Sequence, residues 1–397
     1  MSLPLAGTRV LELTHVWSGP LCGQILADLG AEVIRVESRS HLDIHRRGGP
    51  YPDNIPGINR SGTWNAQNRG KRGCTLDLKS GEGKALFLQL SARSDVVIEN
   101  FTPGTLAKLG LGFETLKDGN PRILLLSLSG YGQTGPHRDS LAYGPMMDAA
   151  IGISAATTYE DGIPRAANGW AADVGGALYG CAAIARALLE QPRSARHLDV
   201  SQFEAGVLFL TGPLLGALNG NAAPERPVIR AAAPTREPDR WIAVSAGTLE
   251  ELTALFDMIA GPQSTTGLMR RLHANGVAEC SVEVQTSFER WARTHQADEA
   301  LARLQAAGVP AVPITRIADL LGDPELAVRQ AWSEVEHAEC GSTCSYGPAI
   351  RLTDANGSRP LNNRAAPLLG GDNDHVYGDI LGLPAERLKD LAARKII

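Results

Sequence analysis

The sequence has no hydrophobic run long enough to cross a lipid bilayer, which takes about 18 or more consecutive apolar residues. Its first residues, MSLPLAGTRVLEL, lack the basic stretch and the long apolar stretch of an export signal. It also lacks an excess of one charge, because 38 Lys and Arg stand against 43 Asp and Glu, for a net charge of -5. These absences argue against bulk binding to nucleic acid or to an anionic membrane, and they predict a cytoplasmic protein.

Cysteine is scarce, with six residues scattered over 397 positions. In a chain without an export signal, this usage is typical of reduced thiols and not of a disulfide framework. The tightest cluster of metal-ligand residues is His337, Cys340 and Cys344, with no fourth ligand nearby to complete a tetrahedral zinc site. We therefore expect neither disulfides nor a bound metal.

Three common enzyme signatures are missing. The first candidate nucleotide turn reads SGPLCG over residues 18–23, without the G-x-G-x-x-G glycines that let the backbone approach a pyrophosphate. Neither a G-x-S-x-G hydrolase turn nor a phosphate-binding P-loop occurs. These absences argue against a nucleotide redox cofactor, a serine hydrolase and a P-loop NTPase.

What the sequence does contain is an alternation of strand-like and helical segments. Residues 9–13, 32–37, 95–100 and 122–127 have the short apolar pattern of strands, and helical spacing follows at residues 21–29 and 82–91. Strands separated by helices pair in parallel. The pattern predicts an α/β fold with an open, Rossmann-like parallel sheet and a ligand crevice at the carboxyl ends of its strands.

Composition divides the chain into four parts. Residues 1–218 form the large domain, and residues 202–218 are so apolar that we expect a buried helix there. Residues 219–238, rich in Ala, Pro, Arg and Asn, form a linker. A smaller α/β domain follows over residues 239–315, in which Thr248 and Glu251 predict a capping box and residues 249, 252, 255 and 259 share one helix face. Residues 316–397 return to the large domain, with Asp323 and Pro324 opening a helix.

Asp173 stands directly before a helix predicted over residues 174–190. Asp in this place is commonly an N-cap, and the helix dipole favours its ionised form. An ionised carboxylate is also what a carboxylate nucleophile requires, so the structural and the chemical interpretation are compatible. Gly175 and Gly176 would let a bulky ligand approach the backbone here.

The chain resembles the class III coenzyme A-transferases, of the formyl-CoA transferase and carnitine CoA-transferase type, over essentially its whole length. The resemblance is carried by GTRVLEL at 7–13, Gly19-Pro20, LGAEVIRVE at 29–37, NRGKR at 68–72, LDLK at 76–79, VIENF-x-PG at 97–104, GYGQTGP at 130–136, DVSQ at 199–202, AGVP at 307–310 and APLLG at 366–370. It implies transfer of CoA between carboxylic acids through a mixed anhydride and an aspartyl-CoA thioester, with Asp173 as the nucleophile. It also implies an interlocked homodimer, with CoA or acyl-CoA as substrate.

The resemblance also implies a set of CoA contacts: Val16, Trp17, Ser18, Arg39, Leu76, Lys79, Asn100, Phe101, Thr102, Lys108 and Tyr143. The phosphorylated ADP end of CoA needs cations, for which Arg39, Lys79 and Lys108 are the candidates.

Two departures from the family pattern concern substrate choice. Formyl-CoA:oxalate members have a glutamine where this chain has Trp17 and a glutamate where it has Gly144. We therefore expect a larger apolar or aromatic acid in place of oxalate. Two alternatives stay open: an α-methylacyl-CoA racemase, although Tyr143 stands where racemases carry their histidine base, and a non-catalytic CoA-fold subunit.

Overall fold

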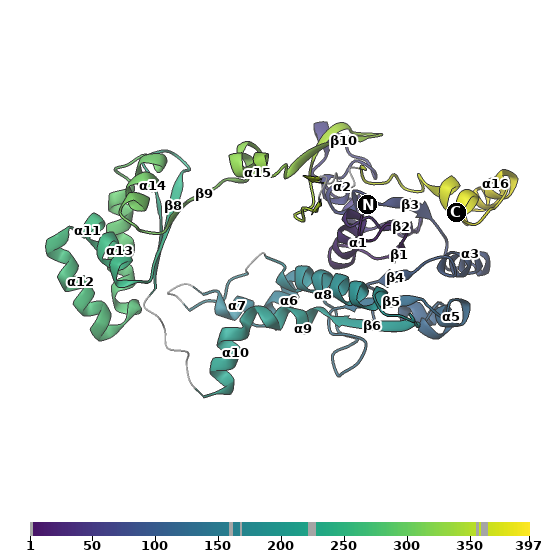
Figure 1. Cartoon of the computed structure of the whole chain (residues 1–397), viewed down its shortest axis with the longest axis horizontal. Helices are drawn as coiled ribbons and strands as arrows, with labels where there is room; N and C mark the ends of the chain where they lie inside the picture. Colours follow the sequence, from purple (N-terminus) through teal and green to yellow (C-terminus); the bar gives the residue numbers. More distant parts are fainter. Residues whose placement is uncertain (1–2, 159–161, 167–168, 221–227, 355–356, 359–363) are drawn as a thin grey trace. The chain divides into compact units, whose positions relative to one another are not determined.

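The computed structural model describes the chain except for residues 1–2, 159–161, 167–168, 221–227, 355–356 and 359–363 (Figure 1). The chain forms two compact units. One comprises Met1–Thr211 together with Gln330–Ile397, and the other comprises Gly212–Arg329. No helix within the described ranges is long and apolar enough to cross a membrane.

The larger unit is built on a six-stranded sheet in the order β3-β2-β1-β4-β5-β6. Every neighbouring pair is parallel, which confirms the expected parallel α/β sheet. The strands are β1 (Arg9–Leu13), β2 (Glu32–Glu37), β3 (Arg72–Thr75), β4 (Val96–Glu99), β5 (Leu124–Ser129) and β6 (Arg196–Ser201). The order reverses between β1 and β4, and ligands bind parallel sheets at such switch points, outside the carboxyl ends of the strands.

Alternating side chains of the strands bury both faces of this sheet. One face carries Leu11, Val97 and Leu125 and packs with α3 (Gly81–Ser91), α5 (Phe113–Gly119) and the C-terminal segments η5 (Asp374–Ile380) and α16 (Ala385–Ala393). The other carries Val10, Val96 and Leu126 and packs with α1 (Ser18–Asp28) and α8 (Ala171–Leu188) (Figure 1).

Shorter elements complete the larger unit. They are η1 (Ile44–Arg46), η2 (Pro52–Asn54), α2 (Gly62–Asn68), α4 (Thr105–Lys108), α6 (Gly144–Ala150), α7 (Ile153–Ala156), α9 (Gln202–Val207), η3 (Leu208–Leu210), and the two-stranded sheets β10 (Trp332–His337) with β11 (Gly341–Tyr346) and β12 (Thr353–Asp354) with β13 (Gly357–Ser358).

The second unit has a three-stranded antiparallel sheet in the order β7-β8-β9. Its elements are α10 (Thr211–Leu218, at the boundary), β7 (Ile229–Pro234), β8 (Trp241–Ala246), α11 (Leu249–Ala260), α12 (Pro262–Asn275), α13 (Val277–Ala292), α14 (Ala297–Ala306), β9 (Ala311–Ile314), η4 (Ile317–Gly322) and α15 (Pro324–Val328). The Thr248–Glu251 capping box of α11 is confirmed, as is the start of α15 with Asp323 as N-cap and Pro324 in the first turn.

Three expectations about local structure differ from what is observed. Strand β7 lies inside residues 219–238, interpreted as linker, because alternate residues of its Ala-rich sequence pack into the core of the second unit. Leu249 is exposed, since it opens α11 before the buried stripe begins. The apolar stretch 202–218 is broken into α9, η3 and α10, and Leu214, Leu215 and Leu218 of α10 lie exposed in the single chain.

Candidate functional site

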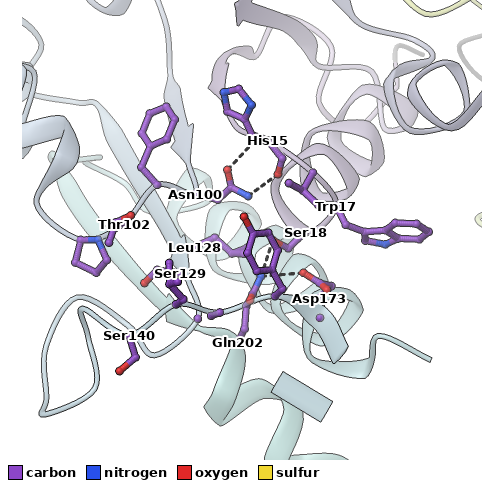
Figure 2. A pocket seen from close by; sticks show the side chains of 18 of the residues that line it. His15, Trp17, Ser18, Asn100, Thr102, Leu128, Ser129, Ser140, Asp173 and Gln202 are labelled. Atoms are coloured by element: carbon purple, nitrogen blue, oxygen red, sulfur yellow. Dashed lines mark hydrogen bonds between the residues drawn. The ribbon is translucent and has the colours of Figure 1, made fainter. Parts of the chain in front are cut away.

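A cavity of about 400 Å³ opens in the larger unit at the carboxyl ends of β1, β4 and β5, where the strand order reverses (Figure 2). Its walls come from the loops that follow these strands and from the first residues of α1, α6, α8 and α9. The lining residues are His15, Val16, Trp17, Ser18, His41, Asn100, Phe101, Thr102, Pro103, Thr105, Leu128, Ser129, Gly130, Arg138, Ser140, Leu141, Ala142, Tyr143, Gly144, Asp173 and Gln202.

The turn between β1 and α1 forms one wall and is held in an unusual backbone conformation. Asn100 pairs with both backbone groups of His15, accepting from its N–H at 2.8 Å and donating to its carbonyl at 2.8 Å (Figure 2). The next residue, Val16, has φ 69°, a left-handed conformation that a β-branched residue rarely adopts. Its N–H donates to the Asp43 carboxylate at 3.0 Å. Such strain persists only where surrounding contacts enforce it, and it clusters at functional sites.

Behind this turn lies a fully buried ionic network. The Arg35 guanidinium donates hydrogen bonds to the Glu12 carboxylate at 2.6 Å and to the Asp43 carboxylate at 2.8 Å. The Lys71 ammonium donates to Glu12 at 3.0 Å. Burial lowers the pKa of Lys71 to about 8 despite the neighbouring Glu12. Burial, with Arg35 adding to the effect, also lowers the pKa of His15 to about 4, so the imidazole that lines the cavity is neutral at pH 7.

Asp173 lies in the first turn of α8 and its carboxylate lines the cavity. It is only 9% exposed. Its Oδ1 accepts a hydrogen bond from Nε2 of Gln202, at the start of α9, at 3.1 Å, and the same Nε2 donates to the Ser18 hydroxyl of α1 at 2.6 Å (Figure 2). Three helices therefore meet at this carboxylate.

The expectation that Asp173 caps its own helix is wrong. The N-cap is Trp170, in a left-handed conformation with φ 44° and ψ 46°, and it places Asp173 as the third residue of the helix. Burial raises the pKa of Asp173 from its ordinary 3.8 to about 6, repulsion from Asp148 adds to this, and the hydrogen bonds from Gln202 and Ser18 oppose it.

Gly144 lies directly against this carboxylate. A Cβ atom at position 144 would stand 2.5 Å from Oδ2 of Asp173 and 3.3 Å from the Trp170 ring, so a side chain there would displace the carboxylate. The Trp170 ring in turn meets Trp17 edge to face, with 4.3 Å between ring centroids. An aromatic pair thus adjoins the Asp173 carboxylate.

The structure brings most of the expected site residues together. Around Asp173, the cavity is lined by Val16, Trp17, Ser18, Asn100, Phe101, Thr102 and Tyr143. Four others lie outside the lining: the Leu76 side chain is buried in the core, while Arg39, Lys79 and Lys108 are exposed. Their contacts to CoA stay predictions.

Sequence reasoning missed three residues of the site. His15 directly precedes the matched Val16, and Gln202 ends the DVSQ segment, so both had a signal in the sequence. Asp148 had none, because its proximity to Asp173 arises only when α6 packs on α8. Within the described residues, His, Cys, Asp and Glu form no group of three or more that could hold a metal ion.

Comparisons with known proteins show the family of the chain. The model of CoA-transferase family III matches residues 5–373. The succinyl-CoA–L-malate CoA-transferase beta subunit of Chloroflexus aurantiacus is 30% identical over 410 residues, covering 100% of this chain and 98% of the relative. The formyl-CoA:oxalate CoA-transferase of Streptomyces coelicolor is 30% identical over 422 residues, with 99% of each chain covered. A solved CAIB/BAIF family protein from Brucella suis is 28% identical, with a TM-score of 0.82 over 96% of this chain and 100% of that chain. The chain belongs to CoA-transferase family III.

Proposed function

We propose that this chain moves CoA from an acyl-CoA donor to a carboxylic acid acceptor, with Asp173 as the nucleophile. The observation that carries the proposal is the buried Asp173 carboxylate, which lines the switch-point cavity and is hydrogen-bonded from a second helix. Family membership supports CoA transfer, and the position of this carboxylate supports its role.

The reaction balances without ATP and without a net proton transfer. The Asp173 carboxylate attacks the thioester carbonyl of the donor, the C–S bond breaks, and a mixed anhydride and CoA thiolate result. The thiolate attacks the aspartyl carbonyl, which gives aspartyl-CoA thioester and releases the donor acid. The acceptor carboxylate then attacks this thioester and expels the thiolate, which finally attacks the acyl carbonyl of the new anhydride. The products are acceptor acyl-CoA and free Asp173.

The surroundings of Asp173 suit a carboxylate nucleophile. A pKa of about 6 leaves it about ten parts ionised to one part protonated at pH 7, while making it more basic than an ordinary aspartate. Gln202 fixes one oxygen by a hydrogen bond, which holds the carboxylate in one orientation. Burial also limits the access of water, to which an anhydride would be lost.

We infer that the acceptor carries an apolar or aromatic group. The relatives act, by their names, on malate and oxalate, which are small and doubly charged. Here the Trp17 and Trp170 rings adjoin the nucleophile, and position 144, next to its carboxylate, carries no side chain. Aromatic surfaces of this kind favour apolar partners.

The test of the proposed function is an exchange assay with the purified chain alone. A panel of acyl-CoA donors is incubated with labelled acids, both dicarboxylic and arylaliphatic, and transfer of CoA onto the acids is scored. We expect transfer without any second protein, and higher kcat/KM for the arylaliphatic acids. Absence of exchange over the whole panel would contradict the function, whereas a preference for dicarboxylates would contradict only the inference on the acceptor.

A further inference from the structure

Asp148 is a buried carboxyl group that the transfer chemistry described above does not use. It lies on α6 and is 2% exposed. Its Oδ1 accepts a hydrogen bond from the Ala171 N–H at 3.2 Å, and its Oδ2 has no hydrogen-bond partner among the described residues. A buried carboxylate with one unpaired oxygen is costly, and such groups require an explanation.

The contact with Ala171 replaces a cap that α8 does not provide for itself. Trp170, the residue before the helix, makes no side-chain capping hydrogen bond. The first N–H groups of a helix need partners from outside the helix, and Asp148 supplies one of them from α6. Asp173 follows Ala171 by two residues, so this contact fixes the helical turn that carries the nucleophile.

The same face of α6 points at the nucleophile. Gly144 and Asp148 are four residues apart on α6, which places them on one side of the helix. A Cβ at Gly144 would lie 2.5 Å from Oδ2 of Asp173, and Asp148 is close enough for its charge to act on that carboxylate.

We propose that Asp148 is a positioning residue for the transfer reaction, holding the first turn of α8 and keeping a second buried carboxyl group beside the Asp173 carboxylate. This inference rests on the proposed function of Asp173. Repulsion between two buried carboxylates makes Asp173 more basic and therefore a stronger nucleophile.

The other groups that face Asp173 do not account for this effect. Gln202 of α9 and Ser18 of α1 hydrogen-bond the carboxylate and act in the opposite direction. The cavity also brings His15, His41, Arg138 and Tyr143 to its lining, and within the described chain none of these is among the groups that shift the pKa of Asp173. The upward shift of the Asp173 pKa therefore comes from burial and from Asp148.

The test compares Asp148→Asn with the wild type as a function of pH. Asn keeps an oxygen for the Ala171 N–H and removes the charge, so the fold and the cap should persist while Asp173 titrates at lower pH. The acid limb of kcat/KM should move to lower pH, and the ratio of variant to wild-type kcat/KM should rise at least about threefold from pH 8 to pH 5. Asp148→Ser, which also removes the charge, should show the same change if the Asn variant does not fold.

A second readout does not depend on turnover. The carboxyl infrared band of Asp173, identified by subtracting the Asp173→Asn spectrum, should titrate at lower pH in Asp148→Asn than in the wild type. An unchanged titration and a constant kcat/KM ratio would overturn the inference and leave Asp148 as a helix cap only. Exchange activity that survives Asp173→Asn would instead overturn the proposed function, and the infrared titration would still decide the role of Asp148.

Discussion

At the scale of single residues, the decisive group is the Asp173 carboxylate. Its burial, its hydrogen bond from Gln202 and its raised pKa of about 6 are each unusual for an aspartate, and all three occur at one cavity wall. Carboxyl groups with a strongly shifted pKa are concentrated at catalytic sites.

Asp173→Asn should abolish transfer, because the amide cannot attack a thioester and the covalent route is lost. We expect kcat to fall by more than about 1000-fold, the loss typical of a removed nucleophile. Asp118→Asn, an exposed aspartate on α5, is the matched control and should keep wild-type kcat. Deamidation of the variant is checked by peptide mass, and retention of a tenth of the activity without it would exclude Asp173 as nucleophile.

The raised pKa of Asp173 also predicts a dependence of stability on pH. The pKa of this carboxyl is about 6 in the folded protein and 3.8 in its ordinary, solvated state. Its contribution to the stability of the fold is therefore complete only below about pH 4, and it is lost as pH rises through 6. Asp173→Asn should therefore be more stable than wild type at pH 8, by up to about 3 kcal/mol, with little difference at pH 4. Denaturant unfolding at pH 8 and pH 4 measures this difference in unfolding free energy between the variant and the wild type. The same difference at both pH values would contradict the burial of an ionised carboxylate.

At the scale of elements, the turn between β1 and α1 forms one wall of the site. Local pattern predicts the strand and the helix, because both follow from the spacing of apolar residues. It does not predict the left-handed Val16, which depends on Asp43 and Asn100, brought from other segments of the chain. Trp170 also adopts the αL conformation and is itself the N-cap of α8, so the N-cap assigned to Asp173 is wrong.

Asp43→Ala should destabilise the larger unit, because it removes one acceptor of the buried Arg35 and the partner of the Val16 N–H. Loss of one member of a buried ionic network lowers the free energy of unfolding by about 3–5 kcal/mol. Asp139→Ala is the control, since Asp139 is exposed and lies 3.3 Å from Arg138; it should change the unfolding free energy by less than about 1 kcal/mol. Equal effects of the two substitutions in urea unfolding would show that the network does not hold this turn.

At the scale of the whole molecule, hydropathy predicts which segments are apolar but not what covers them. Residues 202–218 have the composition of a buried helix, and yet the second half of this stretch is exposed in the single chain. The architecture of the sheet was predictable because each βαβ unit is a local pattern. The second unit extends from 212 to 329, beyond the expected 239–315, because β7 and the segments after β9 join it through contacts distant in sequence.

We expect a homodimer, interlocked as the family resemblance implies, that covers this apolar surface. Within the larger unit, large exposed side chains lie on α8 and η3: Leu178, Tyr179, Leu208 and Phe209. Apolar surface gathered in this way is typical of protein–protein contacts. Sedimentation at micromolar concentration should give twice the chain mass, and a fully active monomer would contradict the expectation.

The central claim, covalent transfer through Asp173, is tested most directly by trapping the intermediate. With an acyl-CoA donor established in the exchange assay, hydroxylamine should convert the aspartyl-CoA thioester to a hydroxamate, which inactivates the enzyme. We expect a donor-dependent mass increase on the peptide spanning residues 166–186, absent in Asp173→Asn. An α-methylacyl-CoA racemase or a passive CoA-binding subunit forms no acyl-enzyme, so an active preparation without this mass shift would contradict the account.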